Sequence, residues 1–185
     1  NVVVYSFTQG IEVGTVNRKG SIIAQNRMAL VDAAREIKAS HILFLDSDHT
    51  IPKDLLVKLL AHDKDIVGIH QPTKLLPCRS NVEDLKGQRL KAPGEGLQEV
   101  SRCGTGIMLV KMSVFDKVKR PWFINTYVDN PLAKVRGWHG EDYNFCENAR
   151  HRGFQIFVDH DVSKECFHIG QATYGVNDII NREQA

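Results

Sequence analysis

Residues 42–48 read Ile-Leu-Phe-Leu-Asp-Ser-Asp, four apolar side chains followed at once by two carboxylates. A short apolar run of this kind is typical of a buried strand. Open α/β folds place their ligands beyond the carboxyl ends of strands, so Asp46 and Asp48 would lie at a binding edge. Two carboxylates this close repel each other and favour a bound cation, and hard divalent metals prefer oxygen ligands. The alternative is a surface turn, since Asp and Ser are common turn residues.

Predicted strands and helices alternate along the rest of the chain. Helices are expected to begin at Ser21, as the N-cap, and at Pro52. Residues 71–99 and 124–140 are expected to be irregular, because proline, glycine and polar residues interrupt any period there. The alternation predicts one α/β domain over residues 1–185, with a sheet covered by helices on its faces. The remaining expected elements are strands at 2–7, 41–45, 65–69, 100–103, 107–110 and 154–158, and helices at 113–118 and 141–152.

Composition excludes several classes of protein. The net charge of +2 over 185 residues is too small to argue for attraction to nucleic acid or membrane. No apolar stretch approaches the ~20 residues that a membrane span needs, and no signal-peptide pattern opens the chain. Four scattered cysteines without Cys-x-x-Cys spacing favour reduced thiols and a cytoplasmic protein. The chain begins at Asn1 without a methionine, as a chain with an incomplete N-terminus does.

Two classes of enzyme place an Asp-x-Asp pair after a strand. In the haloacid-dehalogenase-like phosphatases, Asp46 would be the nucleophile and Asp48 the acid, and Thr50 fits the same signature. Those enzymes need a second acidic pair at the end of another apolar strand. The next acidic pair here, Glu141-Asp142, follows a polar run and opens a helix instead. That arrangement favours the second class of enzyme, whose motifs are given below. A further alternative is a domain that binds carbohydrate with the help of a divalent ion and catalyses no reaction.

Motifs of the second class follow one another along most of the chain. They are Arg27 (followed by Met28 where many such enzymes have Asn), Ile42–Asp48 with Pro52, Lys64–Gly68, Gly104–Gly106, Pro121–Phe123, Gly140–Cys146 and Phe167–Gly170. In this order they resemble the GT-A glycosyltransferases, and the small family-2-type enzymes of phage and bacterial genomes in particular. The resemblance implies a mostly parallel, Rossmann-like central sheet, with its first strand and nucleotide-base loop in Val2–Gly10.

The resemblance also implies a site for the donor, a nucleotide-diphosphate sugar. Asp48 and His168 would hold a divalent cation, and Asp46 would either bind it through water or hold the ribose hydroxyls. Mixed carboxylate and imidazole ligands suit Mn²⁺ well and Mg²⁺ less so. The alternative for His168 is a hydrogen-bonded histidine near the core. Donor contacts are expected from Asp46, Ser47, Arg27, Gly104, Thr105 and Gly106, although a plain hairpin turn explains Gly104–Gly106 nearly as well.

Transfer to a hydroxyl requires a group that takes the hydroxyl proton. Asp142 is the candidate base, which predicts inversion at the anomeric carbon, and Glu141 would bind the acceptor or assist. The alternative is that both acids only complement the positive end of the helix they open. Trp122 would pack on an acceptor sugar or fill the core, and Trp138 is the weaker candidate for the same role. The acceptor itself stays open between a glycan, a lipid, a protein and a modified nucleic acid.

Overall fold

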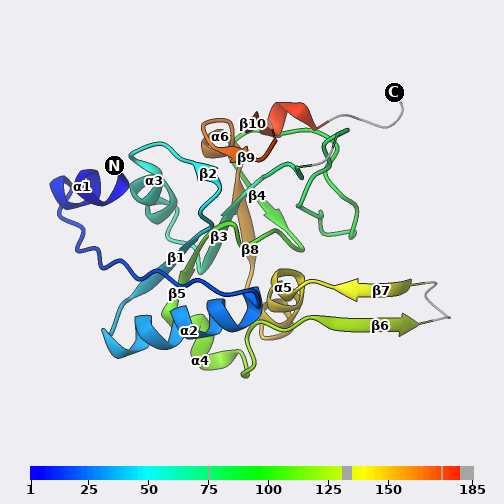
Figure 1. Cartoon of the computed structure of the whole chain (residues 1–185), viewed down its shortest axis with the longest axis horizontal. Helices are drawn as coiled ribbons and strands as arrows, with labels where there is room; N and C mark the ends of the chain where they lie inside the picture. The colour runs from blue at the N-terminus through cyan, green and yellow to red at the C-terminus, as the bar shows by residue number, and fades with distance from the viewer. Residues whose placement is uncertain (75, 131–134, 172, 180–185) are drawn as a thin grey trace.

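The apolar run of residues 42–45 lies in β1 (His41–Leu45), at one edge of a five-stranded sheet in the computed structural model (Figure 1). The structure describes residues 1–74, 76–130, 135–171 and 173–179. The sheet has the order β1-β5-β3-β8-β4. Its other strands are β3 (Ile66–Ile69), β4 (Leu97–Val100), β5 (Ile107–Lys111) and β8 (Ile156–Asp159).

The prediction of a mostly parallel sheet is wrong. Only β3 and β8 pair in parallel, whereas β1–β5, β3–β5 and β4–β8 pair antiparallel. The α/β alternation was a sound indication for β1, β3 and β8, which all run in one direction. It could not show that β5 enters between β1 and β3 in the opposite direction. The result is a mixed α/β domain whose carboxyl edge still collects the ends of three strands.

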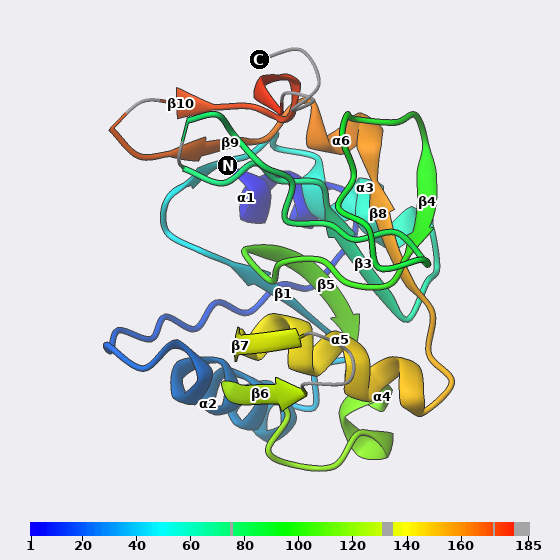
Figure 2. The same ribbon diagram turned by 90° about the vertical axis from the view of Figure 1, so that its right-hand side faces the viewer.

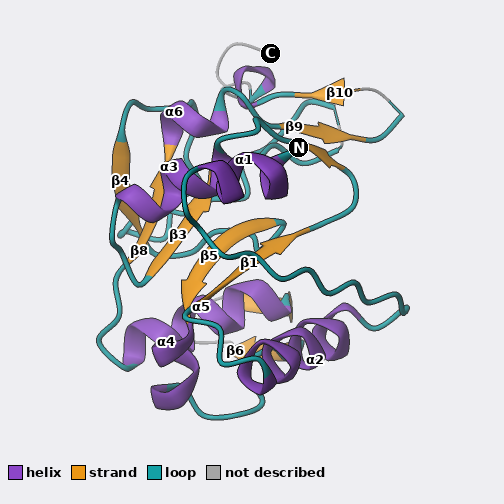
Figure 3. Cartoon of the chain, turned by 90° about the vertical axis from the view of Figure 1, so that its left-hand side faces the viewer, coloured by secondary structure: helices purple, strands orange, loops and turns teal. Residues whose placement is uncertain are grey.

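Helices cover both faces of this sheet, as predicted (Figure 3). One core cluster packs α2, α4 and α5 against Phe44, Met108 and Val110, and the other packs α3 and α6 against Val67 and Leu109. Odd and even strand residues therefore face different clusters, in the period of two that a buried strand requires. The helices are α1 (Val2–Thr8), α2 (Ile23–Glu36), α3 (Leu55–Ala61), α4 (Met112–Lys117), α5 (Glu141–His151), α6 (His160–Ser163) and the 3₁₀ turn η1 (Val176–Asp178).

The N-terminal segment differs from its prediction. Residues 2–7 are not a strand but helix α1, whose first turn is capped where the Asn1 Oδ1 accepts the Val3 N–H at 3.0 Å. The β-branched residues favour a strand locally, but this cap and the packing of α1 beside α3 outweigh that weak preference. Val2–Gly10 therefore contains neither a first strand nor a loop at the sheet edge.

Smaller differences concern where elements begin. Ser21 is not the N-cap of α2, which Ile22 occupies without a side-chain hydrogen bond. Pro52 precedes α3 by three residues, and the predicted strand at 100–103 is shifted to β4, Leu97–Val100. Pro52 and Gly104 indicate that a helix or strand begins or ends nearby. The backbone hydrogen bonds determine the residue at which it does so.

Two further pairings were not predicted. A small sheet joins β2 (His49–Thr50), β9 (Phe167–Ile169) and β10 (Thr173–Tyr174), of which β9 and β10 lie near the top of the molecule in Figure 2. Residues within the expected polar loop 124–140 form a hairpin, β6 (Thr126–Asn130) and β7 (Val135–His139), that extends away from the body of the molecule in Figure 1.

All four cysteines are buried, and no disulfide joins them. Among the residues that the structure describes, no helix combines the length and the apolar character that crossing a membrane demands.

Candidate functional site

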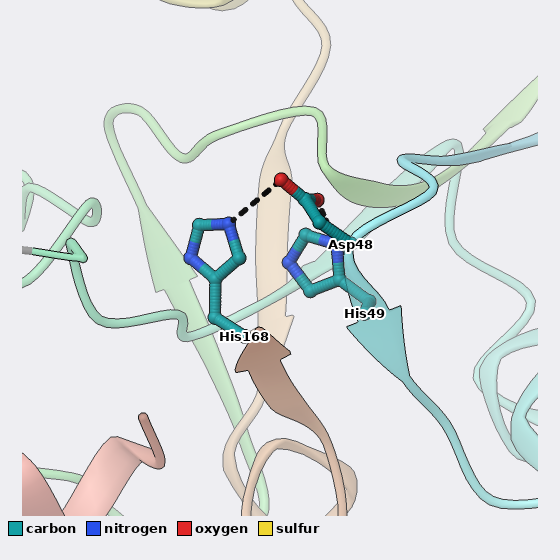
Figure 4. Close-up of side chains that lie close together, drawn as sticks. All are labelled: Asp48, His49 and His168. Carbon is teal, nitrogen blue, oxygen red and sulfur yellow. Dashed lines mark ion pairs between the residues drawn. The ribbon is translucent and has the colours of Figure 1, made fainter. Parts of the chain in front are cut away.

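Asp48, His49 and His168 form a cluster of potential metal ligands (Figure 4). One ligand atom from each lies within 4.8 Å of the other two. The backbone explains the cluster, because β2 and β9 pair antiparallel with His49 opposite His168, and the Ile169 N–H donates to the Asp48 carbonyl at 2.7 Å. Directly opposite side chains in such a pair lie side by side. The two imidazole rings stack with centroids 4.3 Å apart, and Asp48 lies against both.

The atoms that face one another in this cluster suit a cation. The Asp48 Oδ2 lies 3.6 Å from the His168 Nε2, and its Oδ1 lies 3.2 Å from the His49 Nδ1. Asp48 Oδ1 and His49 Nδ1 are buried without a hydrogen bond from any described residue. Because buried polar atoms are normally satisfied, these two atoms satisfy each other when the His49 Nδ1 carries the proton, and a cation can satisfy both when it does not.

His168 is oriented as metal-binding histidines usually are. Its Nδ1 donates to the Pro72 carbonyl at 3.1 Å, which leaves the Nε2 lone pair directed at Asp48. His49 is held differently. The Gln71 N–H donates to the Asn81 Oδ1, the Asn81 Nδ2 donates to the Gln71 Oε1, and the Gln71 Nε2 therefore faces the His49 Nε2. His49 must change tautomer before its Nδ1 can bind a metal, so His168 is the readier ligand.

Lys74 supplies a positive charge to the same carboxylate. Its ammonium contacts the Asp48 Oδ2. Burial alone would raise the pKa of Asp48, but Lys74, with help from His49 and His168, lowers it below its ordinary value. Asp48 therefore stays ionised at neutral pH. One carboxylate and two imidazoles fit a divalent transition metal such as Mn²⁺, with Mg²⁺ the poorer match.

Asp46 lies outside this cluster, and its predicted role at the metal stays a prediction. Its carboxylate pairs with the Arg27 Nη2 at 3.4 Å, and the Arg27 Nη1 pairs with the Glu141 Oε1. Arg27 reaches both acids because it lies on the buried face of α2, with a side chain only 8% exposed. Ser47 is exposed between the two aspartates. Arg27 thus joins the end of β1 to the start of α5.

Asp142 is a half-buried carboxylate beside the same turn. Burial and the Glu141 carboxylate raise its pKa above the ordinary value, against the opposing influence of the Tyr143 N–H and Arg27. The Tyr143 N–H donates to its Oδ1 at 2.8 Å. A carboxylate with a raised pKa is a better proton acceptor than an exposed one. Asp142 therefore has the chemistry that a general base needs.

The turn Gly104–Gly106 separates the metal cluster from Asp142. A Cβ at Gly104 would lie 2.6 Å from the Asn81 Nδ2 and 3.6 Å from the Asp142 Oδ2. A Cβ at Gly106 would lie 3.0 Å from the His49 Cε1. Thr105 between them is fully buried. Glycine is required at both ends of the turn because side chains from two sites approach its backbone closely.

A cavity of about 400 Å³ opens on the Asp142 side of this turn. Its wall comes from three groups of residues: Thr73, Ser80, Asn81 and Glu83; Arg89 and Arg102; and Trp138, His139, Gly140, Asp142 and Tyr143 at the junction of β7 and α5. Asn81 lines the cavity and also belongs to the hydrogen-bond chain that reaches His49. The cavity and the metal cluster are therefore neighbours joined through Asn81 and Gln71.

Trp122 does not line this cavity. Its indole is 3% exposed, and its Nε1–H donates to the carbonyls of Phe115 and Val118, both at 3.1 Å. The expectation that it packs on an acceptor is wrong, because a side chain buried among Phe115 and Phe123 cannot meet a ligand. The aromatic residues that do line the cavity include Tyr143 and Trp138, and Trp138 is 74% exposed.

Sequence reasoning missed His49, Gln71, Lys74 and Asn81. His49 directly follows Asp48, so a histidine beside an acidic pair was the available signal. The other three belong to the long segment 71–99, whose length alone indicated a functional loop. Nothing local in the sequence shows which of its residues turn toward Asp48.

No protein-family model and no curated protein matches the chain. Solved structures do, including the crystal structure of A197 from STIV. That protein superposes with a TM-score of 0.58 at 20% identity, over 98% of this chain and 89% of its own length. A structural similarity at this sequence identity establishes a shared fold, and the chemistry has to be inferred from the residues of the site.

Proposed function

We propose that the protein is a metal-dependent glycosyltransferase, built on a variant of the GT-A fold, that moves a sugar from a nucleotide-diphosphate donor to an acceptor hydroxyl. The observation that carries the proposal is the cluster Asp48–His49–His168 next to a cavity lined by a half-buried carboxylate, Asp142. A cation site and a general base on two sides of one glycine turn are what such a transfer needs.

The donor diphosphate belongs on the metal side of the turn. When bound there, a divalent cation supplies positive charge to the departing diphosphate. The Gly104–Gly106 backbone leaves room for the donor sugar to approach. Asp46, 47% exposed and held by Arg27, can accept hydrogen bonds from ribose hydroxyls. Lys74, displaced from Asp48, can contact a phosphate oxygen.

The acceptor belongs on the cavity side, where Asp142 accepts its hydroxyl proton. The acceptor oxygen then forms a bond to the anomeric carbon as the bond from that carbon to the diphosphate oxygen breaks. The electron pair of the broken bond leaves with the nucleoside diphosphate. Because the attacking and leaving oxygens lie on opposite faces of the sugar, the transfer inverts the anomeric carbon.

The experiment is a donor panel with Mn²⁺, in which release of nucleoside diphosphate is measured with and without acceptors. Asp48→Ala should abolish metal-dependent donor binding, and unchanged activity in that variant would remove the metal cluster from the mechanism. Asp142→Asn should bind donor normally and lose roughly 10²–10⁴-fold in transfer rate, the usual contribution of a general base. Turnover at the parental rate would exclude Asp142 as the base.

The two alternatives give different results in the same assay. A phosphatase acting through an aspartyl intermediate on Asp46 should hydrolyse simple phosphate esters and should survive Asp142→Asn. The ion pair of Asp46 with Arg27, outside the metal cluster, argues against that role. A binding-only domain should hold carbohydrate and Mn²⁺ but release no nucleoside diphosphate from any donor.

A further inference from the structure

The hairpin β6–β7 brings Trp138 to the wall of the cavity, with Tyr127 packed against it. Tyr127 and Trp138 are directly opposite in its register, and their rings meet edge to face with centroids 5.4 Å apart. Tyr127 is 49% exposed and Trp138 is 74% exposed. The other tryptophan of the chain, Trp122, is in the core. An exposed indole beside a cavity offers a flat apolar face that a ligand can cover.

The polar wall of the cavity has balanced charge. Glu83 and Asp142 are acidic, whereas Arg89 and Arg102 are basic. Arg102 pairs with Glu83 at 3.5 Å and with Glu147 at 2.9 Å. Binding of a phosphate backbone relies on an excess of Lys and Arg, which this wall lacks. The wall suits a neutral ligand with several hydrogen-bonding groups.

We infer that the cavity binds a neutral carbohydrate, whose ring packs on Trp138 and whose hydroxyls meet the carboxylates and guanidiniums of the wall. A sugar ring has an apolar face of C–H groups and a rim of hydroxyls, so it matches an indole bordered by planar polar groups. The volume of about 400 Å³ lies in the range of small-molecule sites. This inference rests on the proposed function, since it makes the acceptor a glycan and not a lipid, a protein or a nucleic acid.

The position of Asp142 indicates how a sugar ring would be oriented in the cavity. It lines the cavity near the Gly104 backbone, whereas Trp138 lies on the hairpin that borders it. A ring stacked on Trp138 therefore extends from the exposed mouth toward the carboxylate. One hydroxyl of that ring would be the nucleophile, and Trp138 would act as a positioning residue that selects a sugar.

Binding can be measured without donor or metal. We would add methyl glycosides of glucose, galactose, mannose and N-acetylglucosamine to the whole chain, and follow saturation-transfer NMR and tryptophan emission. At least one glycoside should bind saturably, and the emission of exposed Trp138 should shift to the blue as the ring covers it. Trp138→Ala should weaken that binding about three- to tenfold, while Trp138→Phe should keep most of it. Phe7→Ala, which removes an exposed aromatic side chain on α1, should leave binding unchanged.

The opposite results are equally clear. Binding that is the same in Trp138→Ala and in the unaltered protein overturns the inference, and so does the absence of binding by every glycoside. Binding of a short single-stranded oligonucleotide that depends on Trp138, in place of a glycoside, also overturns it. Because Trp138 is exposed, its replacement should not affect folding, and thermal unfolding of each variant checks this. Glycoside binding without metal-dependent donor turnover would refute the proposed function alone, whereas donor turnover without glycoside binding would refute this inference alone.

Discussion

At the scale of single residues, the site is defined by what Asp48 contacts. Its carboxylate is shared by one ammonium and two imidazoles, and two of its contacts come from residues more than twenty positions away in the sequence. The pairing of Asp48 with His168 was predicted, whereas those with Lys74 and His49 were not. Asp46 instead pairs with a buried arginine, Arg27, and its role at the metal stays a prediction. The side-chain types in the motif could be assigned from sequence, but their partners depend on tertiary contacts.

Replacement of Lys74 tests whether its ammonium competes with a metal. Lys74→Ala should tighten Mn²⁺ binding up to about fivefold, because the metal no longer has to displace an ion pair of partly exposed groups. Isothermal titration of Mn²⁺ gives the comparison. Lys86→Ala, an exposed lysine in the same segment, is the control and should leave the affinity unchanged. Weaker binding in Lys74→Ala would show that the lysine assists the metal.

The raised pKa of Asp142 makes a prediction about stability. A carboxyl whose pKa is higher in the folded state stabilises the fold fully below the pKa of the unfolded chain, about 3.9. That contribution is lost as the pH rises through the folded-state value, where burial of the charge becomes costly. Asp142→Asn should therefore raise the melting temperature at pH 7–8, and the gain should shrink toward pH 4. A variant that is less stable at pH 8 than at pH 4, relative to the parent, contradicts the shift.

At the scale of elements, most of the structure that could not be predicted depends on pairing between strands that are far apart in the sequence. β9 lies more than a hundred residues from β2, so the pairing that brings His168 to His49 has no local sign. The hairpin β6–β7 was hidden for a different reason, since its strands are short, largely polar and interrupted by Gly137 at φ +148°. In contrast, α5 was predicted at nearly its observed bounds because two acids open it and Gly153 follows it.

The turn before β5 allows its two sides to be tested separately. Gly106→Ala should push a Cβ against His49 and Gln71, both 3.0 Å away, and weaken Mn²⁺ binding several-fold. Gly104→Ala should instead displace Asn81 and disturb Asp142, so transfer should fall while Mn²⁺ binding changes less. Neither glycine has a positive φ, so alanine fits the backbone at both. Equal effects of the two variants on metal binding would show that the turn acts as one unit.

At the scale of the whole molecule, the site lies where the carboxyl edge of the main sheet meets the small sheet. The layers and the α/β class were predictable, because the apolar periods of β1, α3, β3 and β5 are strong. The strand directions were not, since an α/β alternation is compatible with one inserted antiparallel strand. The predicted position of Asp48 at the carboxyl edge of the sheet does not depend on that error, because β1, β3 and β8 still run in the same direction. Its prediction depended only on where β1 ends.

A metal at Asp48 would tie these parts together, since its ligands come from the end of β1, from β2 and from β9. A ligand present at a hundred times its dissociation constant stabilises the folded state by about 2.7 kcal/mol. For a chain of this size that corresponds to a rise of roughly 5–10 °C in melting temperature. Calorimetry with saturating Mn²⁺ should show this rise in the parent, a smaller one in His168→Ala and none in Asp48→Ala. Mg²⁺ at the same concentration should produce a smaller shift, because two imidazoles favour the softer ion. A rise of the same size in Asp48→Ala would place the stabilising ion elsewhere and separate the carboxylate from any role in metal binding.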